Sequence, residues 1–109
     1  VVRLEEVFAD IDKKPVAKKC EALEGLLKEA DEVLTDIEDA ATCDAGIISS
    51  AQTFEHYGMA RYRTLNGWAH QLKLANAAKL LEKSLKEEMA ADEALTDLAE
   101  GNINQQLAA

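Results

Sequence analysis

The sequence contains very little glycine and proline, and this scarcity limits the choice of fold. Five glycines and one proline stand among 109 residues, too few for the many turns of a strand-rich sandwich or barrel. Alanine, leucine, glutamate and lysine are plentiful, and these residues are strong helix formers. We therefore expect one all-α domain over residues 1–109, arranged as a helical bundle.

Positive charge and cysteine are also in short supply. Twelve basic residues stand against 21 acidic ones, for a net charge of -9, which repels phosphate backbones and anionic lipids. We expect neither nucleic acid nor a membrane surface as a partner, and no apolar run approaches the roughly 20 residues that span a bilayer. Because Cys20 and Cys43 form no CxxC pair, we expect reduced thiols and a cytoplasmic location.

Familiar catalytic motifs are absent from the sequence. It contains no glycine-rich phosphate loop, no GxSxG elbow, no HExxH pair and no calcium loop with EF-hand spacing. The two histidines, His56 and His70, do not by themselves define a nucleophilic site. The sequence thus leaves open whether the chain is an enzyme.

Apolar residues recur at helical spacing along four stretches of the chain. They predict helices over about 1–11, 16–37, 41–72 and 76–100. Pro15 separates the first two helices, and Asp39 is the expected N-cap of the third. Gly101 is expected to end the fourth helix in a left-handed conformation.

In each predicted helix, the residues three and four apart that face the core form a row, which we call a seam. In the last two helices, acidic residues interrupt this otherwise apolar seam. In the third helix Glu55 lies one turn from Ala51 and Gly58, whose small side chains leave room beside it. In the fourth, Glu88 and Asp92 lie one turn apart on one face. Since burying unpaired carboxylates costs several kcal/mol, a shared metal ion, iron or manganese, is the compact solution.

Other interpretations stay open at this stage. The acids could face solvent at the core boundary, because 30% of the residues are charged, and the Glu-x-x-His pair of many di-iron bundles is missing. His56 is turned about 100° around the helix from Glu55, so it is either a ligand from the edge or a hydrogen-bonding neighbour. Tyr62, Phe54 and Trp68 are expected in the core.

Three stretches of the chain resemble one known family. They are KPVAKKCEALEGLLKEA from Lys14, AQTFEHYGMARYRTL from Ala51 and LKEEMAADEALTDLA from Leu85, and they are similar to the YciE/YciF family of bacterial stress-associated, ferritin-like proteins. The resemblance implies a rubrerythrin-like bundle, a homodimer and a di-iron centre. It also implies that this chain, which opens in helical phase at Val1 without a cap, lacks the first helix and most of the second.

The resemblance also implies a ligand set. Glu55 in the third bundle helix and Glu88 with Asp92 in the fourth would bind the metal, and Glu87 replaces Glu88 if the register slips by one. Lys73 departs from relatives, which often have glycine there. The expected function is a stress-associated protein with a dinuclear iron or manganese centre, for oxidase-type or peroxidase-type chemistry or for metal sequestration. The alternative is a metal-free helical dimerisation module.

Overall fold

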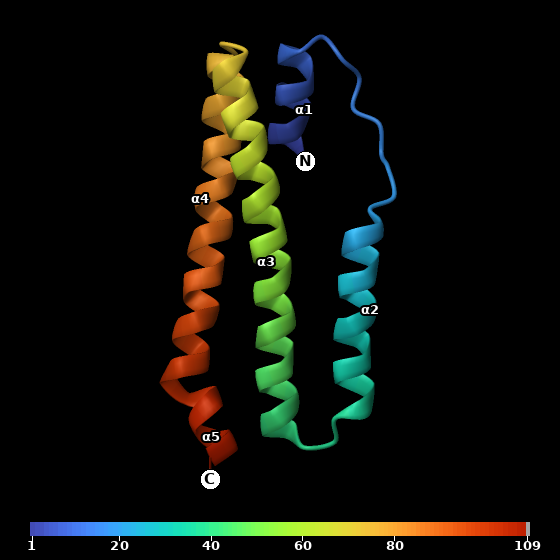
Figure 1. The fold of residues 1–109 in the computed structure, drawn as a ribbon, viewed down its shortest axis with the longest axis vertical. Helices are drawn as coiled ribbons and strands as arrows, with labels where there is room; N and C mark the ends of the chain where they lie inside the picture. Colours follow the sequence, from blue (N-terminus) through green and yellow to red (C-terminus); the bar gives the residue numbers. More distant parts are fainter. Residues whose placement is uncertain (109) are drawn as a thin grey trace.

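A long hairpin of two helices forms the centre of the fold (Figure 1). The computed structural model describes residues 1–108. Its elements are α1 (Val2–Asp10), α2 (Glu21–Asp36), α3 (Ala40–Gln71), α4 (Ala75–Leu98), the π-helical turn η1 (Ala99–Ile103) and α5 (Asn104–Ala108). No strand occurs within the described residues, so the prediction of an all-α helical bundle is confirmed. In this bundle α3 pairs along its length with α4, α2 packs on α3, and α1 packs on α4.

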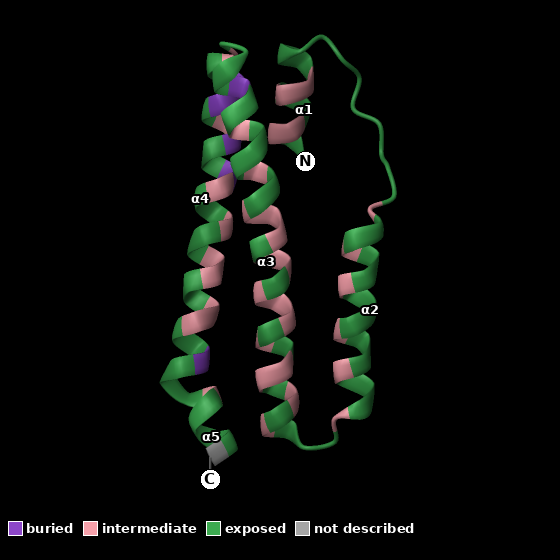
Figure 2. Cartoon of the chain, viewed as in Figure 1, coloured by how far each residue is buried: buried purple, intermediate pink, exposed green. Residues whose placement is uncertain are grey.

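The best-buried residues gather at the closed end of the α3–α4 hairpin, where α1 also lies (Figure 2). Ala69 of α3 and Ala77, Ala78 and Leu81 of α4 form this core, and each is at most 5% exposed. Alanines on both helices let the two backbones approach closely, and the amide of Asn66 donates to the carbonyl of Ala78 at 2.7 Å. Partly buried apolar residues surround this core, namely Leu4, Val7, Tyr62 and Leu74.

The two ends of α3 follow from local chemistry. Asp39 caps the helix, because its carboxylate accepts from the Thr42 amide at 2.8 Å and from the Thr42 hydroxyl at 2.7 Å. The predicted N-cap is therefore confirmed, and these bonds hold the pKa of Asp39 below its usual value. At the other end Lys73 adopts a φ of 58°, a left-handed conformation that favours glycine. The turn therefore forms with lysine at a position suited to glycine.

The second helix begins later than the sequence pattern suggests. A helix was expected over 16–37, but α2 starts at Glu21 and residues 13–20 have no regular structure. Val16 is 80% exposed, so no apolar contact holds this stretch in a helix. Its four lysines would also lie at a helix N-terminus, where positive charge is unfavourable. Starting the helix at Glu21 instead places Glu21 and Glu24 in the first turn, which suits the helix dipole.

Two further expectations are wrong. Gly101 does not end a helix in a left-handed conformation, because it has no positive φ and lies inside η1, which continues α4 into α5. Trp68 is 62% exposed and does not belong to the core, because the space against Ala69 is filled by Ala77, Ala78 and Leu81. None of the described helices combines the length and the apolar character needed to cross a membrane.

Candidate functional site

Two of the candidate carboxylates meet across the α3–α4 interface. Glu55 lies near the middle of α3 and Glu88 near the middle of α4. Both side chains line the same hollow, and interaction with Glu55 is the main cause that raises the pKa of Glu88. Two carboxyl groups can share a hydrogen bond only when one of them holds a proton, since an ionised carboxylate is an acceptor only. The proximity of the two carboxyl groups therefore favours the protonated form of Glu88.

The proton on this pair is held more tightly than on an ordinary glutamate. The pKa of Glu88 is raised from 4.5 to about 7, first by interaction with the Glu55 carboxyl group, then by burial, and then by the charges of Glu55 and Glu87. No basic side chain forms an ion pair with Glu55 or Glu88 within residues 1–108. The pair is thus a concentration of uncompensated negative charge, which a cation would stabilise.

Asp92 lies one turn along α4 and has partners of its own. Its Oδ1 accepts from Gln52 Nε2 at 3.3 Å and lies 3.0 Å from His56 Nε2. Gln52 also donates to the Thr96 hydroxyl at 2.7 Å, so this network ties α3 to α4. The Asp92 side chain is 19% exposed and that of His56 is 64% exposed, which places His56 at the edge of the interface.

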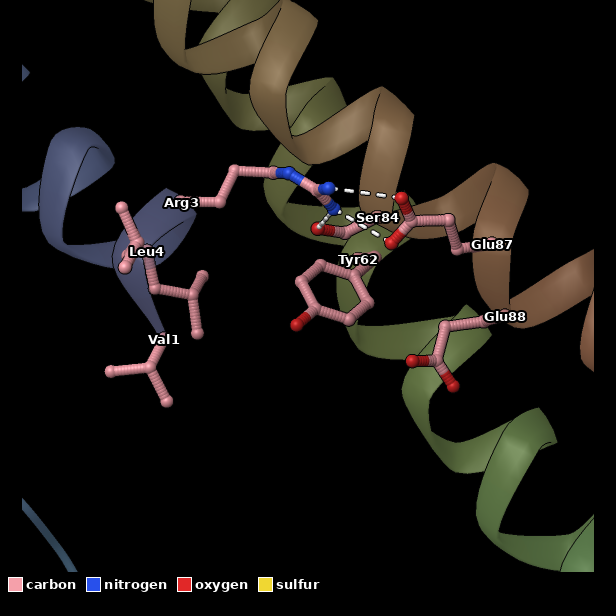
Figure 3. A pocket seen from close by; sticks show the side chains of 8 residues that line it. Val1, Arg3, Leu4, Tyr62, Ser84, Glu87 and Glu88 are labelled. Carbon is pink, nitrogen blue, oxygen red and sulfur yellow. Dashed lines mark hydrogen bonds and ion pairs between the residues drawn. The ribbon is translucent and has the colours of Figure 1, made fainter.

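Glu87 faces a different part of the molecule from Glu88 (Figure 3). Arg3 of α1 binds it through two hydrogen bonds of 2.8 and 2.9 Å and also donates to the Ser84 hydroxyl at 2.8 Å. This pair lowers the pKa of Glu87. In Figure 3 the Glu88 side chain points away from Arg3, toward α3. The structure therefore pairs Glu88, not Glu87, with Glu55.

Glu88 lines two hollows. One, of about 440 Å³, opens between α1 and α4 and includes Arg3, Tyr62 and Glu87 (Figure 3). The other, of about 420 Å³, is lined by both members of the Glu55–Glu88 pair and by side chains of α1, α2 and α3. Small ions in solvent therefore have access to the Glu55–Glu88 pair.

The structure brings together only part of the expected ligand set. Glu55 meets Glu88, while Asp92 meets His56, and no group of three or more histidine, cysteine or acidic side chains suited to a metal ion occurs in residues 1–108. Gln52 was missed as a partner of Asp92, although it lies four residues before His56 and so on the same face. Nothing in the sequence indicates that Arg3 pairs with Glu87, since 84 residues separate them.

A second chemically distinctive cluster surrounds Cys20 at the start of α2. The Cys20 thiol lies 3.4 Å from the Tyr57 hydroxyl, which also accepts from Arg61 Nε at 3.2 Å. The hydrogen bond with Tyr57 is the main cause that lowers the pKa of Cys20, and the amides of Leu23 and Ala22 and the charge of Arg61 add to it. The thiolate, which is the reactive form, is thus favoured at Cys20.

This cluster predicts unequal reactivity of the two thiols. Iodoacetamide near neutral pH should alkylate Cys20 several-fold faster than Cys43, which is also half-buried and free, and peptide mass spectrometry over time measures both rates. Tyr57→Phe should slow the reaction at Cys20 and leave Cys43 unchanged. Equal rates at the two thiols, or no effect of Tyr57→Phe, would contradict the expected role of the Tyr57 hydroxyl.

Comparisons with known proteins agree on one family. A family model described as "Domain of unknown function (DUF892)" matches residues 1–108. Protein YciF of Escherichia coli (strain K12) is 49% identical over 87 residues, which are 80% of this chain and 52% of YciF. The chain therefore spans about half the length of this curated relative.

Solved structures give the same result. The crystal structure of the E. coli stress protein YciF superposes with a TM-score of 0.88 at 44% identity, covering 94% of this chain and 65% of that one. YcfI from Rhodopseudomonas palustris superposes with a TM-score of 0.83 at 42% identity, covering 87% and 60% of the two chains. The helical arrangement described above is thus shared with both structures.

Proposed function

The chain belongs to the DUF892 family, and from this premise we propose that it is a stress-associated protein that binds a metal ion through Glu55 and Glu88. The stress association comes from its similarity to YciF, which is described as a stress protein. The metal proposal comes from the chain's own residues. A cytoplasmic location is part of the same proposal.

The single observation that supports metal binding is that the Glu55 and Glu88 carboxyl groups, from facing helices, line one hollow, where Glu55 raises the pKa of Glu88 to about 7. Two carboxyl groups from facing helices would hold a cation in place of a proton on Glu88, since carboxylate oxygens suit iron and manganese. Asp92 lies one turn further along α4 and could add an oxygen donor once its contacts with His56 and Gln52 are broken. These residues fit part of a metal site.

A dinuclear centre would need more donors than this chain brings together. Bundles of that kind use carboxylates and histidines from four helices, so the remaining ligands would come from a second copy in a homodimer or from residues outside 1–108. When bound, iron or manganese supplies redox chemistry with oxygen or peroxide. The chain's own residues bind and orient the ion, and the two hollows beside Glu88 give small molecules access.

Anaerobic titration of chelator-treated protein with Fe(II) or Mn(II), followed by calorimetry, tests this proposal. We expect the wild-type protein to bind the ion. Glu88→Gln or Glu55→Gln should weaken binding by roughly a hundredfold or more, because loss of a residue that merely hydrogen-bonds to a metal ligand already weakens binding by about 10–100-fold. Glu87→Gln is the matched control, because Glu87 binds Arg3 instead, and it should leave binding unchanged. Absence of binding to the wild type, or equal losses in the Glu87 and Glu88 variants, would refute the assignment.

A second candidate, a metal-free dimerisation module, is favoured by the exposed surface. The accessible surface is 7915 Å², whereas a compact monomer of 11.9 kDa exposes only about 5,900 Å². The excess, about 2,000 Å², is of the size that one subunit buries in an obligate dimer. Light scattering with and without metal distinguishes the candidates, because this module would form dimers equally in both conditions and in Glu88→Gln.

A further inference from the structure

A glycine in the middle of α3 makes room for the Glu88 carboxyl group. A Cβ atom placed on Gly58 would lie 2.9 Å from Glu88 Oε2, 3.2 Å from its Cδ and 3.6 Å from its Cγ. The first distance is shorter than real Cβ atoms tolerate, so an alanine at this position would push the carboxyl group aside. The Glu88 carboxyl group thus lies directly on the α3 backbone, one turn from Glu55.

The helix gains nothing from this glycine. Glycine inside a helix is destabilising relative to alanine, and Gly58 has no positive φ that would require it. Gly67, on the same helix, offers a comparison, because a Cβ there would meet nothing within 4 Å. The two glycines therefore have the same effect on helix stability and differ in their contact with Glu88.

We infer that Gly58 is a positioning residue for the metal site, an inference that rests on the proposed function. By leaving out a side chain, Gly58 lets the Glu88 carboxyl group reach across to Glu55, so that both donors are directed at one place. A displaced carboxyl group would find space in the hollow of about 440 Å³ between α1 and α4. The donors would then be separated while the helices stay packed.

Replacing Gly58 by alanine distinguishes an effect on the position of the Glu88 carboxyl group from an effect on the stability of the helix. The contact at Gly58 is with the end of a flexible side chain, so Gly58→Ala should fold, with a thermal midpoint equal to or above that of the wild type. Gly67→Ala should shift the midpoint in the same direction. Mn(II) affinity should fall roughly tenfold to a hundredfold in Gly58→Ala and stay at the wild-type value in Gly67→Ala.

Each outcome of the Mn(II) titration is decisive. If wild-type protein binds Mn(II) and Gly58→Ala binds it equally well, the positioning role is refuted and the proposed function stands. If wild-type protein binds neither Mn(II) nor Fe(II), the proposed function fails and the inference fails with it. Equal losses in Gly58→Ala and Gly67→Ala would show a general effect of glycine replacement in α3 and would also overturn the inference.

Discussion

Leu81→Ala is expected to destabilise the protein by about 3 kcal/mol, the middle of the range for buried leucines. Leu81 is 3% exposed, and its neighbours in the core of the hairpin are the small residues Ala69, Ala77 and Ala78. It is therefore the large side chain on which this core depends, and Leu4 and Val7 pack against the same core. Its removal should lower the thermal midpoint by more than about 10 °C and loosen α1.

Circular dichroism melting of Leu81→Ala and Leu98→Ala measures this effect. Leu98 also lies on α4 but is 59% exposed, so the same substitution should change stability by no more than about 0.5 kcal/mol. The two variants lose the same atoms from the same helix and differ in burial alone. Equal midpoints for the two variants would contradict the assignment of the core to the closed end of the hairpin.

The parts of the fold that could be predicted from sequence are those set by local chemistry. The Asp39 cap is a contact between residues three apart, and the long helices follow from repeated apolar spacing. The start of α2 could not be predicted in this way, because Val16 continues the helical pattern yet meets no other helix. Trp68 is similar: its spacing fits a core, but which residues face it depends on packing between helices.

The candidate site also combines contacts that local sequence sets with contacts that depend on packing between helices. Seam spacing places Glu55 and Glu88 on facing sides of two helices, and both side chains line one hollow of the structure. The choice between Glu87 and Glu88 could not be made from sequence, because it depends on Arg3 of α1 binding Glu87. The position of Asp92 depends on His56 and Gln52, partners that spacing within α4 does not reveal.

The pH dependence of stability is the second effect that we expect to be large. The pKa of Glu88 is raised from 4.5 to about 7 in the folded protein, so between these values the folded state binds more protons than the unfolded state. Unfolding free energy then falls as pH rises through this window. Ionising Glu88 in the folded protein therefore lowers the unfolding free energy by roughly 1 to 2 kcal/mol. This value is smaller than the full pKa shift would give, because solvent screens the group.

Glu88→Gln in chelator-treated protein should remove this penalty. The variant's thermal midpoint should match that of the wild type near pH 4.5, where Glu88 is protonated in the folded protein, and exceed it increasingly toward about pH 8. Glu87→Gln should instead lower the midpoint by a nearly constant amount over this range, because Arg3 lowers the pKa of Glu87 and the stability from that pair is lost only below the ordinary glutamate pKa. A difference between Glu88→Gln and wild type that stays constant over this range would show that folding does not raise the pKa of Glu88. In that case the protonated form of Glu88 would not be favoured, and the charge argument for a bound cation would lose its basis.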